Sequence, residues 1–434
     1  MRSKLVLGMS FFALSAGAVH AGGWSASNLN TNFMYSDGGS VELSTGDLDY
    51  KIKAETAKSF GSSPAENVDV VKDQTRTSIS ISAAASDKIS IGASNFVSGS
   101  IQLQGGAGSA QSWIPDADAK MTTNALLGTY QFNDNLSLLF GLSDERLANT
   151  TVSTINGTYT LDGGTANRLI IGGSYSIPDI ALRVSVSYMP KSSITSNSSF
   201  TETNVIAVAG NAGINLETAT YGDAVAAANL PAVLGGPIDV ADAGLTLLNS
   251  PDASGNYSSS ADAISDINTA SALIADVSNY QSQVGLPETL IVDFQTGIAK
   301  DTLLFGSITH GKWSDAQIVS NTGSAFSKIA TEFDDSTGYT LGIGRRLSDK
   351  FSVSATLASE AGGGAKSSSL FTVSNGSKSL TLGGRYTDGN MVVSAGYNMT
   401  EVGGVTIETA SGTELAKYGT NTVSAFGIKV AFNF

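Results

Sequence analysis

The last fourteen residues of the chain, 421–434, alternate between apolar side chains and small or polar ones. Counting back from the carboxyl end, the apolar positions are Phe434, Phe432, Val430, Ile428 and Phe426. The positions between them are Asn433, Ala431, Lys429, Gly427 and Ala425. Side chains of a strand point to opposite faces with a period of two, so this stretch predicts a strand with one apolar face. A chain that ends on an aromatic residue in this way is typical of bacterial outer-membrane barrels.

The amino terminus has the layout of a secretory signal peptide, residues 1–21. Arg2 and Lys4 give it a positive start, Leu5–Leu14 is apolar, and small residues precede a cut before Gly22. No other stretch approaches the roughly 20 apolar residues that a membrane helix needs. We therefore expect an exported chain that enters a membrane as a closed barrel, the other arrangement that satisfies every backbone group in lipid.

Composition excludes several other classes of protein. The chain has no cysteine, so a small secreted domain held together by disulfides is not expected. Without Arg2 and Lys4 the chain has 22 basic and 38 acidic residues, a net charge of −16, which argues against nucleic acid as a partner. The 48 glycines and only eight prolines suit an all-β chain with many turns.

Six pairs of alternating segments, each joined by a tight turn rich in Asp, Asn or Gly, fill the chain between its two ends. The turns lie at 86–88, 133–135, 177–179, 300–301, 348–350 and 388–390. With one strand at each end, 40–53 and 421–434, the count is fourteen. An even count with short turns on one side suits an outer-membrane barrel. We predict an all-β fold, a transmembrane antiparallel β-barrel of 14 strands over residues 40–434, preceded by a short luminal or plug segment, 22–39.

The connection 190–287 is too long to be a bare loop. Within it, Ser260–Val284 places Ile264, Ile267 and Ile274 near one helical face. We therefore predict a long extracellular loop with helices. Their apolar faces would pack against each other, against the barrel mouth or against an apolar ligand.

Several polar side chains fall on the strand face opposite the apolar one. They are Gln131, Arg183, Asp293, Gln295, Arg346, Arg385 and Lys429. A Lys or Arg in the middle of the lipid face would cost roughly 2–4 kcal/mol, so this parity supports the strand assignment. Charge pairing across the lumen would account for any one of them. The functional alternative is that Arg183, Arg346, Arg385 or Lys429 holds the carboxylate of a ligand.

Three short stretches carry a resemblance to a known family. Leu286-Pro287-Glu288 opens a strand after the long insertion, Trp313-Ser314 follows one hairpin later, and Ile91-Gly92-Ala93-Ser94 is followed by Gly99. With the strand count and the aromatic terminus, these stretches resemble the FadL-type outer-membrane transporters of long-chain fatty acids and other hydrophobic compounds. The family has a Leu-Pro-Glu entry to its eighth strand and a Trp-Ser at the outer end of its ninth.

The resemblance also implies a weak point in the wall. The third strand of the family kinks inward and opens a gap, and Gly92 and Gly99 are the expected sites of that kink. Glycine inside a strand commonly marks a bulge or bend, although ordinary barrel curvature would also use it. The chain departs from the family at its amino terminus, where residues 22–39 are shorter than the usual plug and lack its Asn-Pro-Ala motif.

The leading hypothesis is passive uptake of a hydrophobic molecule such as a long-chain fatty acid. Outside loops that carry Trp113 and Ile114 would capture the molecule, and Phe96 is a further candidate for binding it. It would leave through the lumen or sideways through the gap. The alternative is a porin-like diffusion channel for small polar solutes, because a fourteen-stranded lumen is either plugged or wet.

No catalytic residue, metal site or cofactor is expected. His310 is the one histidine of the mature chain, so a Ser-His hydrolase has a single candidate base. No G-x-S-x-G motif surrounds a plausible nucleophilic serine, and no set of Cys and His residues could bind zinc. The expected partners are outer-membrane lipid and lipopolysaccharide, the hydrophobic ligand, and the barrel assembly machinery acting on Phe434. A surface adhesin or phage receptor is a third reading for the outside loops.

Overall fold

The computed structural model describes 20–21, 24–35, 38–56, 68–105, 114–154, 157–202, 277–321, 331–364, 366–367, 369, 371–408, 412 and 414–434. Within these residues no helix has both the length and the apolar character to cross a membrane. The described chain is almost entirely antiparallel strand.

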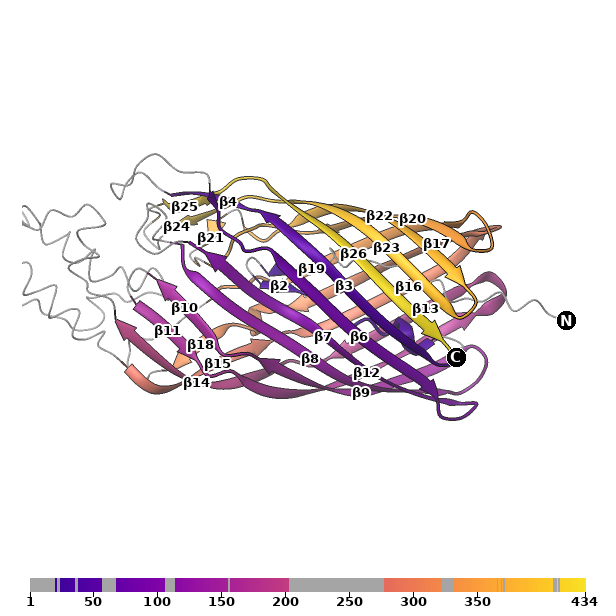
Figure 1. Cartoon of the computed structure of the whole chain (residues 1–434). Helices are drawn as coiled ribbons and strands as arrows, with labels where there is room; N and C mark the ends of the chain where they lie inside the picture. Colours follow the sequence, from indigo (N-terminus) through magenta and orange to yellow (C-terminus); the bar gives the residue numbers. More distant parts are fainter. Residues whose placement is uncertain are drawn as a thin grey trace, which may run out of the picture.

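Fourteen strands form a closed barrel, as the sequence predicts (Figure 1). They are β3 (Ser40–Lys51), β6 (Gln74–Ala84), β7 (Ile89–Gln104), β8 (Asp116–Gln131), β9 (Leu136–Leu147), β12 (Gly164–Ile177), β13 (Leu182–Met189), β16 (Glu288–Ala299), β17 (Thr302–Lys312), β19 (Ser336–Arg346), β20 (Phe351–Glu360), β22 (Ser377–Asp388), β23 (Met391–Val402) and β26 (Asn421–Asn433). Each strand pairs with the next, and β26 closes the ring against β3 from Thr422↔Lys51 to Asn433↔Ser40.

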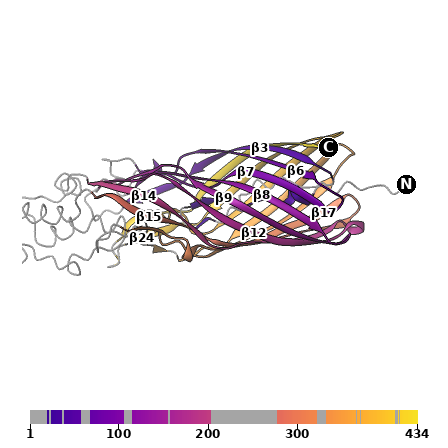
Figure 2. The same cartoon turned by 90° about the horizontal axis from the view of Figure 1, so that it is seen from below.

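The two ends of the barrel differ in their connections. Tight turns join β6 to β7, β8 to β9, β16 to β17, β19 to β20 and β22 to β23, and a short 3-10 turn, η3 (Pro178–Ile180), joins β12 to β13. The carboxyl terminus lies at this same end in both views (Figures 1 and 2). We call it the inner end and the opposite end, which carries the long connections, the outer end.

The wall of the barrel has an apolar outside and a polar inside. On the terminal strand, Phe426, Ile428 and Phe432 are exposed, while Ala425, Lys429 and Ala431 are buried. The same alternation runs around the ring, with Leu126 and Leu357 more than 60% exposed and many Ser and Thr side chains buried. A soluble protein has the reverse arrangement, whereas this one suits a wall whose outside meets lipid and whose inside is polar.

The outer end carries additional strands. Five of them pair in series, beginning at the outer end of β8: β10 (Thr150–Thr154), β11 (Gly157–Leu161), β14 (Ser192–Glu202), β15 (Val277–Leu286) and β18 (Ile318–Asn321). A second, smaller sheet consists of β4 (Lys53–Thr56), β5 (Val68–Asp69), β21 (Lys366–Ser367), β24 (Val405–Glu408) and β25 (Glu414–Tyr418).

A continuous apolar cluster, which we call the outer core, fills the outer end. Its members include Tyr50, Ile52, Val71, Leu103, Ile114, Val373, Val402, Ile407 and Tyr418. They come from the outer ends of barrel strands, from the smaller sheet and from the connections between them. The outer mouth is therefore packed with side chains.

The predicted helix Ser260–Val284 is wrong in its last part. Residues 277–284 lie in β15, which pairs with β14. The spacing of three residues between Val277 and Tyr280 matches a helical face, but the long-range pairing with β14, which has an irregularity between Ser198 and Ser199, makes this part a strand. The remainder of that helix, and the other helices expected in 190–287, lie outside the described residues.

The amino-terminal segment, described over 20–21 and 24–35, lies inside the barrel. β1 (His20–Ala21) pairs with β2 (Trp24–Ala26), which pairs with β7, and a 3-10 turn, η1 (Asn32–Tyr35), contacts β6, β7 and β8. Phe33 and Met34 of η1 are almost fully buried in a second apolar cluster, the inner cluster. The inner cluster consists of Leu29, Phe33, Met34, Ala125, Leu127, Leu139, Ile170 and Met189. It fills the lumen near the inner end.

Candidate functional site

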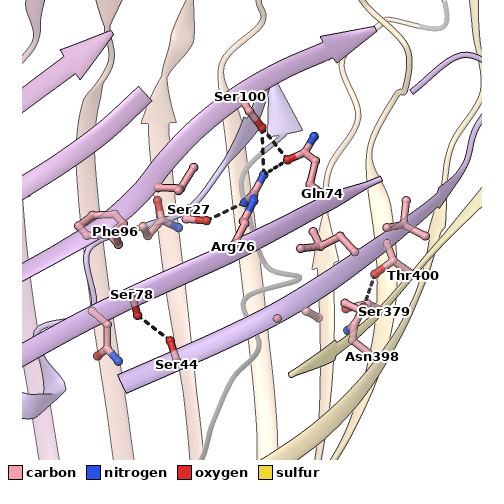
Figure 3. Close-up of a pocket in the computed structure, with 18 of the residues that line it drawn as sticks. Ser27, Ser44, Gln74, Arg76, Ser78, Phe96, Ser100, Ser379, Asn398 and Thr400 are labelled. Carbon is pink, nitrogen blue, oxygen red and sulfur yellow. Dashed lines mark hydrogen bonds between the residues drawn. The ribbon is translucent and has the colours of Figure 1, made fainter. Parts of the chain in front are cut away.

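A chamber of about 340 Å³ lies in the lumen between the outer core and the amino-terminal segment. Its walls come from residues 27–30 and 32 and from ten barrel strands, β3, β6, β7, β16, β17, β19, β20, β22, β23 and β26 (Figure 3). This volume is in the range of small-molecule sites, which are concave and largely pre-formed.

Serine and threonine side chains form a belt around the middle of the chamber. They bond to each other across neighbouring strands: Ser44 Oγ lies 2.6 Å from Ser78 Oγ, and Ser80 Oγ lies 2.9 Å from Ser94 Oγ. On the opposite wall Ser307 Oγ lies 2.7 Å from Thr340 Oγ1. We call these residues, with Thr356, the hydroxyl belt.

The outer side of the chamber is apolar. It is lined by Leu48, Tyr50, Val71, Leu103, Val402 and Val423, most of which belong to the outer core. These residues lie at the outer ends of β3, β7, β23 and β26, or in the connection after β3. The polarity of the lining therefore changes along the chamber, from the hydroxyl belt in its middle to these apolar residues on its outer side, which we call the apolar ceiling.

One seam of the wall is incompletely paired. β6 and β7 pair only from Ala84↔Ser90 to Ser78↔Phe96, although β7 continues to Gln104. Just past Phe96 a bulge shifts the β7–β8 register between Val97 and Gly99. Bulges bend a strand and end its regular pairing. Pairing on this edge of β7 resumes farther toward the outer end, where Val71 pairs with Leu103 and the amide of Lys72 donates to the carbonyl of Gln102. We call the stretch of wall between these two pairings, at 97–101 of β7, the open seam.

The amino-terminal segment occupies the edge of β7 that β6 leaves. Ser25 pairs with Ser100 and Ala26 with Gly99, and the amide of Ser27 donates to the carbonyl of Ser98 at 2.9 Å. The three pairs add one short strand to β7 from inside the barrel. The open seam is thus covered by a segment that is not part of the wall.

Arg76 joins the three elements that meet at the open seam (Figure 3). Its guanidinium donates to Ser27 Oγ of the amino-terminal segment at 2.7 Å, to Ser100 Oγ of β7 at 3.3 Å and to Gln74 Oε1 of β6 at 3.2 Å. Ser100 Oγ in turn donates to the same Gln74 oxygen at 2.8 Å. Arg76 thereby fixes the amino-terminal segment against both strands.

The two glycines expected at a kink have different surroundings. Gly99 lies at the bulge and pairs with Ala26. Gly92 lies in regular pairing nearer the inner end of the same strand, where an added Cβ would clash with Met34 Sδ and with the Ile81 carbonyl oxygen. Gly92 therefore makes room for the amino-terminal segment.

The four predicted carboxylate-binding residues do not gather at one place. Lys429 lines the chamber and pairs with Glu42 at 3.3 Å. Arg385 faces the lumen beside Glu42 but does not line the chamber. Arg346 pairs with Asp301 at the inner end, outside the chamber.

Arg183, the fourth of these residues, binds the amino-terminal segment. It donates to Asn32 Oδ1 at 2.6 Å, and its guanidinium carbon lies 5.1 Å from the centre of the Tyr35 ring. This geometry is a hydrogen bond and a cation–π contact to η1. In this structure Arg183 holds the turn that carries Phe33 and Met34 in the inner cluster.

The three apolar residues expected to contact a ligand are placed as follows. Phe96 lines the chamber at the last β6–β7 pair and packs against the inner cluster. Ile114 is buried in the outer core. Trp113 lies outside the described residues.

The sequence reasoning missed a buried charge cluster around Arg168. The Arg168 guanidinium lies 3.7 Å from the Glu145 carboxylate and donates to the carbonyls of Pro190 and Pro287 at 3.1 and 2.6 Å. These carbonyls mark the two ends of the long insertion, so one side chain fastens both. The alternation of exposed Leu169 and Ile171 with Arg168 could have identified it as inward-facing.

Arg76 was also missed, although Thr75 and Thr77 flank it in an alternating strand and put it on the lumen face. In the described part of the chain no group of His, Cys, Asp and Glu side chains could hold a metal ion.

The sequence matches no protein family and no curated protein. The fold is similar to a Pseudomonas aeruginosa FadL homologue, with a TM-score of 0.65 and 12% identity over 93% of this chain and 92% of that one. It is similar to the Pseudomonas putida toluene transporter TodX, with a TM-score of 0.56 and 10% identity over 96% of this chain and 98% of that one. It is also similar to the Ralstonia pickettii toluene transporter TbuX, with a TM-score of 0.54 and 12% identity over 99% of this chain and 100% of that one. At these identities the likeness concerns the fold, and the chain has the fourteen-stranded barrel fold of the FadL-type proteins.

Proposed function

We propose that the protein is a channel of the bacterial outer membrane for the passive uptake of hydrophobic molecules such as long-chain fatty acids. The export signal in residues 1–21 would be removed, and the barrel assembly machinery would insert the chain by way of its last strand and Phe434. The outside loops would capture the ligand from water and pass it to the chamber.

The open seam carries this proposal. A ligand in the chamber lies beside Phe96, where the pairing of β6 with β7 stops, and the described segment whose backbone pairs with β7 within that opening is the amino-terminal segment. Backbone pairing normally seals a membrane barrel completely, since unpaired groups in lipid are costly. A segment that pairs with β7 from inside can withdraw without breaking the ring. Sideways exit into the bilayer at this seam then avoids the inner cluster.

Uptake by cells tests the proposal. A Gram-negative host that lacks its own fatty-acid channel would be supplied with this chain, and entry of a labelled long-chain fatty acid would be followed. We expect saturable entry that is absent in the host with an empty vector. Entry at the vector's rate from correctly folded, surface-exposed barrel would contradict the proposal.

The porin-like alternative is supported by the hydroxyl belt, because a polar lining suits a wet lumen. Conductance separates the two functions. The purified protein in a planar bilayer would show a large steady current and free passage of sugars if it is a diffusion channel. We expect a small current, because the outer core and the inner cluster fill the lumen on both sides of the chamber.

A further inference from the structure

The hydroxyl belt has hydrogen-bonding capacity that the wall itself does not use. A hydroxyl supplies one donor and two acceptor sites. In a pair such as Ser44–Ser78 or Ser307–Thr340, one proton lies between the two oxygens and the second proton is left to point elsewhere. Each pair thus offers the chamber a donor and several acceptor sites. A bare hydrocarbon in this place would cover these groups without bonding them, which is unfavourable.

The apolar outer side of the chamber suits an apolar part of a ligand instead. Leu48, Val71 and Leu103 face it from three elements, with Tyr50 beside them. A water molecule against these side chains finds few hydrogen-bond partners, whereas burying an alkyl or aromatic group there is favourable because it removes apolar surface from water. The two zones lie in one cavity, so a single ligand can fill both with its two ends.

The charges of the chamber are matched. Glu42 and Lys429, both largely buried, pair at 3.3 Å, and the Arg76 guanidinium already donates to Ser27, Gln74 and Ser100. Asp293 also lines the cavity. A carboxylate head group would add a negative charge near Glu42 and Asp293 and would lose hydration on entering the chamber. A neutral head group that donates and accepts hydrogen bonds avoids that cost.

We propose that the chamber prefers amphiphiles with a neutral hydrogen-bonding head, such as an alcohol, ester or amide on an apolar body, over a hydrocarbon or a carboxylate with the same body. This inference rests on the proposed uptake of hydrophobic molecules and ranks them: a fatty acid still enters the chamber through its apolar chain, but it binds there more weakly than an alcohol, ester or amide with the same chain. The head group bonds to the hydroxyl belt while the body lies against the ceiling.

Three ligands of equal body test the preference: butylbenzene, 4-phenylbutan-1-ol and 4-phenylbutanoate at pH 8. Each is measured by equilibrium dialysis against the full-length protein in lipid nanodiscs, with uptake by empty nanodiscs subtracted. We expect the alcohol to bind about ten-fold more tightly than butylbenzene, which corresponds to one or two net hydrogen bonds. We expect the carboxylate to bind no better than the hydrocarbon.

Variants of the belt locate the effect. Thr340→Val and Thr356→Val remove a belt hydroxyl while keeping the branched shape, and each should weaken the alcohol about five-fold without weakening butylbenzene. Thr129→Val is the matched control, since Thr129 is buried in β8 but does not line the chamber. It should leave all three affinities unchanged.

The outcomes separate the inference from the proposed function. Butylbenzene binding as tightly as the alcohol would overturn the head-group preference and leave hydrophobic uptake intact. Tightest binding by the carboxylate would overturn it in favour of a charged head. No saturable binding of any of the three would overturn both.

Discussion

Two seams of the barrel, on either side of the β3–β6 pair, are built differently. The closing seam joins the two ends of the barrel sequence and is paired along its whole length, from Thr422↔Lys51 to Asn433↔Ser40. The open seam joins two strands of one tight hairpin, yet its pairing stops at Ser78↔Phe96. The pairing is thus continuous where the two ends of the barrel sequence meet, and it is interrupted next to a local hairpin before it resumes at Val71↔Leu103.

The difference arises from what each seam binds in the lumen. At the closing seam, Lys429 of β26 and Glu42 of β3 pair directly across the junction. At the open seam, the bulge before Gly99 turns β7 away, and Arg76 of β6 donates to the amino-terminal segment. At the closing seam the two wall strands pair directly, whereas at the open seam the backbone of β7 pairs with a separate segment and side chains of β6 bond to both. The second arrangement can open while the ring stays closed.

A disulfide between the amino-terminal segment and β7 should give the largest effect. Ser25 and Ser100 are directly paired, and the Cα separation of such pairs suits a disulfide. The chain has no other cysteine to interfere. Ser25→Cys with Ser100→Cys should abolish uptake of a labelled fatty acid when oxidised, and reduction should restore it. Uptake is measured in the same cells before and after reduction.

The closing seam supplies the matched control for this crosslink. Leu43→Cys with Val430→Cys joins a directly paired couple of β3 and β26, and uptake should be the same oxidised and reduced. The single change Ser100→Cys controls for the lost Arg76 contact. Full uptake through the oxidised Ser25–Ser100 crosslink would show that the open seam is not the exit.

The ring itself could be predicted because its signals are local. Alternation and turn residues depend on a few neighbouring positions. β9, β17 and β23 begin, and β16 ends, directly beside the predicted turns 133–135, 300–301 and 388–390. Parity also placed Arg183 and Lys429 on the lumen face. Local patterns determine which face a side chain occupies.

The contents of the lumen could not be predicted in the same way. Arg183 bonds to Asn32, which lies 151 positions away, and Arg168 bonds to Pro287, which lies 119 positions away. Such partners depend on the register of many strands at once. The smaller sheet at the outer end combines segments from three connections, and the open seam depends on how far β6 and β7 stay paired. None of these has a short-range signature in a single sequence.

Breaking the ion pair of the closing seam should give the next largest effect. Lys429 and Glu42 have side chains only 9% and 14% exposed, so Lys429→Met leaves a buried carboxylate without its ammonium partner. We expect a loss of about 3 kcal/mol in the free energy of unfolding, measured by urea titration in detergent micelles. Glu42→Gln added to Lys429→Met should recover part of it.

An exposed pair provides the comparison for that loss. Lys350 and Asp388 at the inner end are each more than half exposed, so Lys350→Met should cost less than about 1 kcal/mol. Equal losses for Lys350→Met and Lys429→Met would mean that the ion pair does not stabilise the closing seam.

Adding a methyl group under the amino-terminal segment should give an intermediate effect. A Cβ at Gly92 would meet the Met34 sulfur and the Ile81 backbone oxygen, so Gly92→Ala should push η1 out of the inner cluster. We expect a cost of about 1–3 kcal/mol and a larger single-channel current. Gly384→Ala on β22 is the control, since nothing lies within 4 Å of its added Cβ. An unchanged current in Gly92→Ala would show that η1 does not seal the lumen.

The smallest effect is expected away from both seams, at the outer end of β17. Asp315, in the short 3-10 turn η4 (Trp313–Asp315), accepts from Lys312 at 3.0 Å and from Lys191 at 3.2 Å. These two hydrogen bonds lower the pKa of the Asp315 carboxyl, and the bond from Lys312 has the larger effect. A lowered folded pKa gives stability that is present above the unfolded value of about 3.9 and is lost as the pH falls through the folded value.

Asp315→Asn should therefore lower the thermal midpoint slightly at pH 7 and have no effect well below pH 3. The change at pH 7 should be smaller than that of Lys429→Met, because all three side chains are substantially exposed and screened by water. Uptake should be unchanged, since neither seam is touched. A loss of uptake in this variant would mean that transport also depends on the start of the long connection, where Lys191 bonds to Asp315 just after β17.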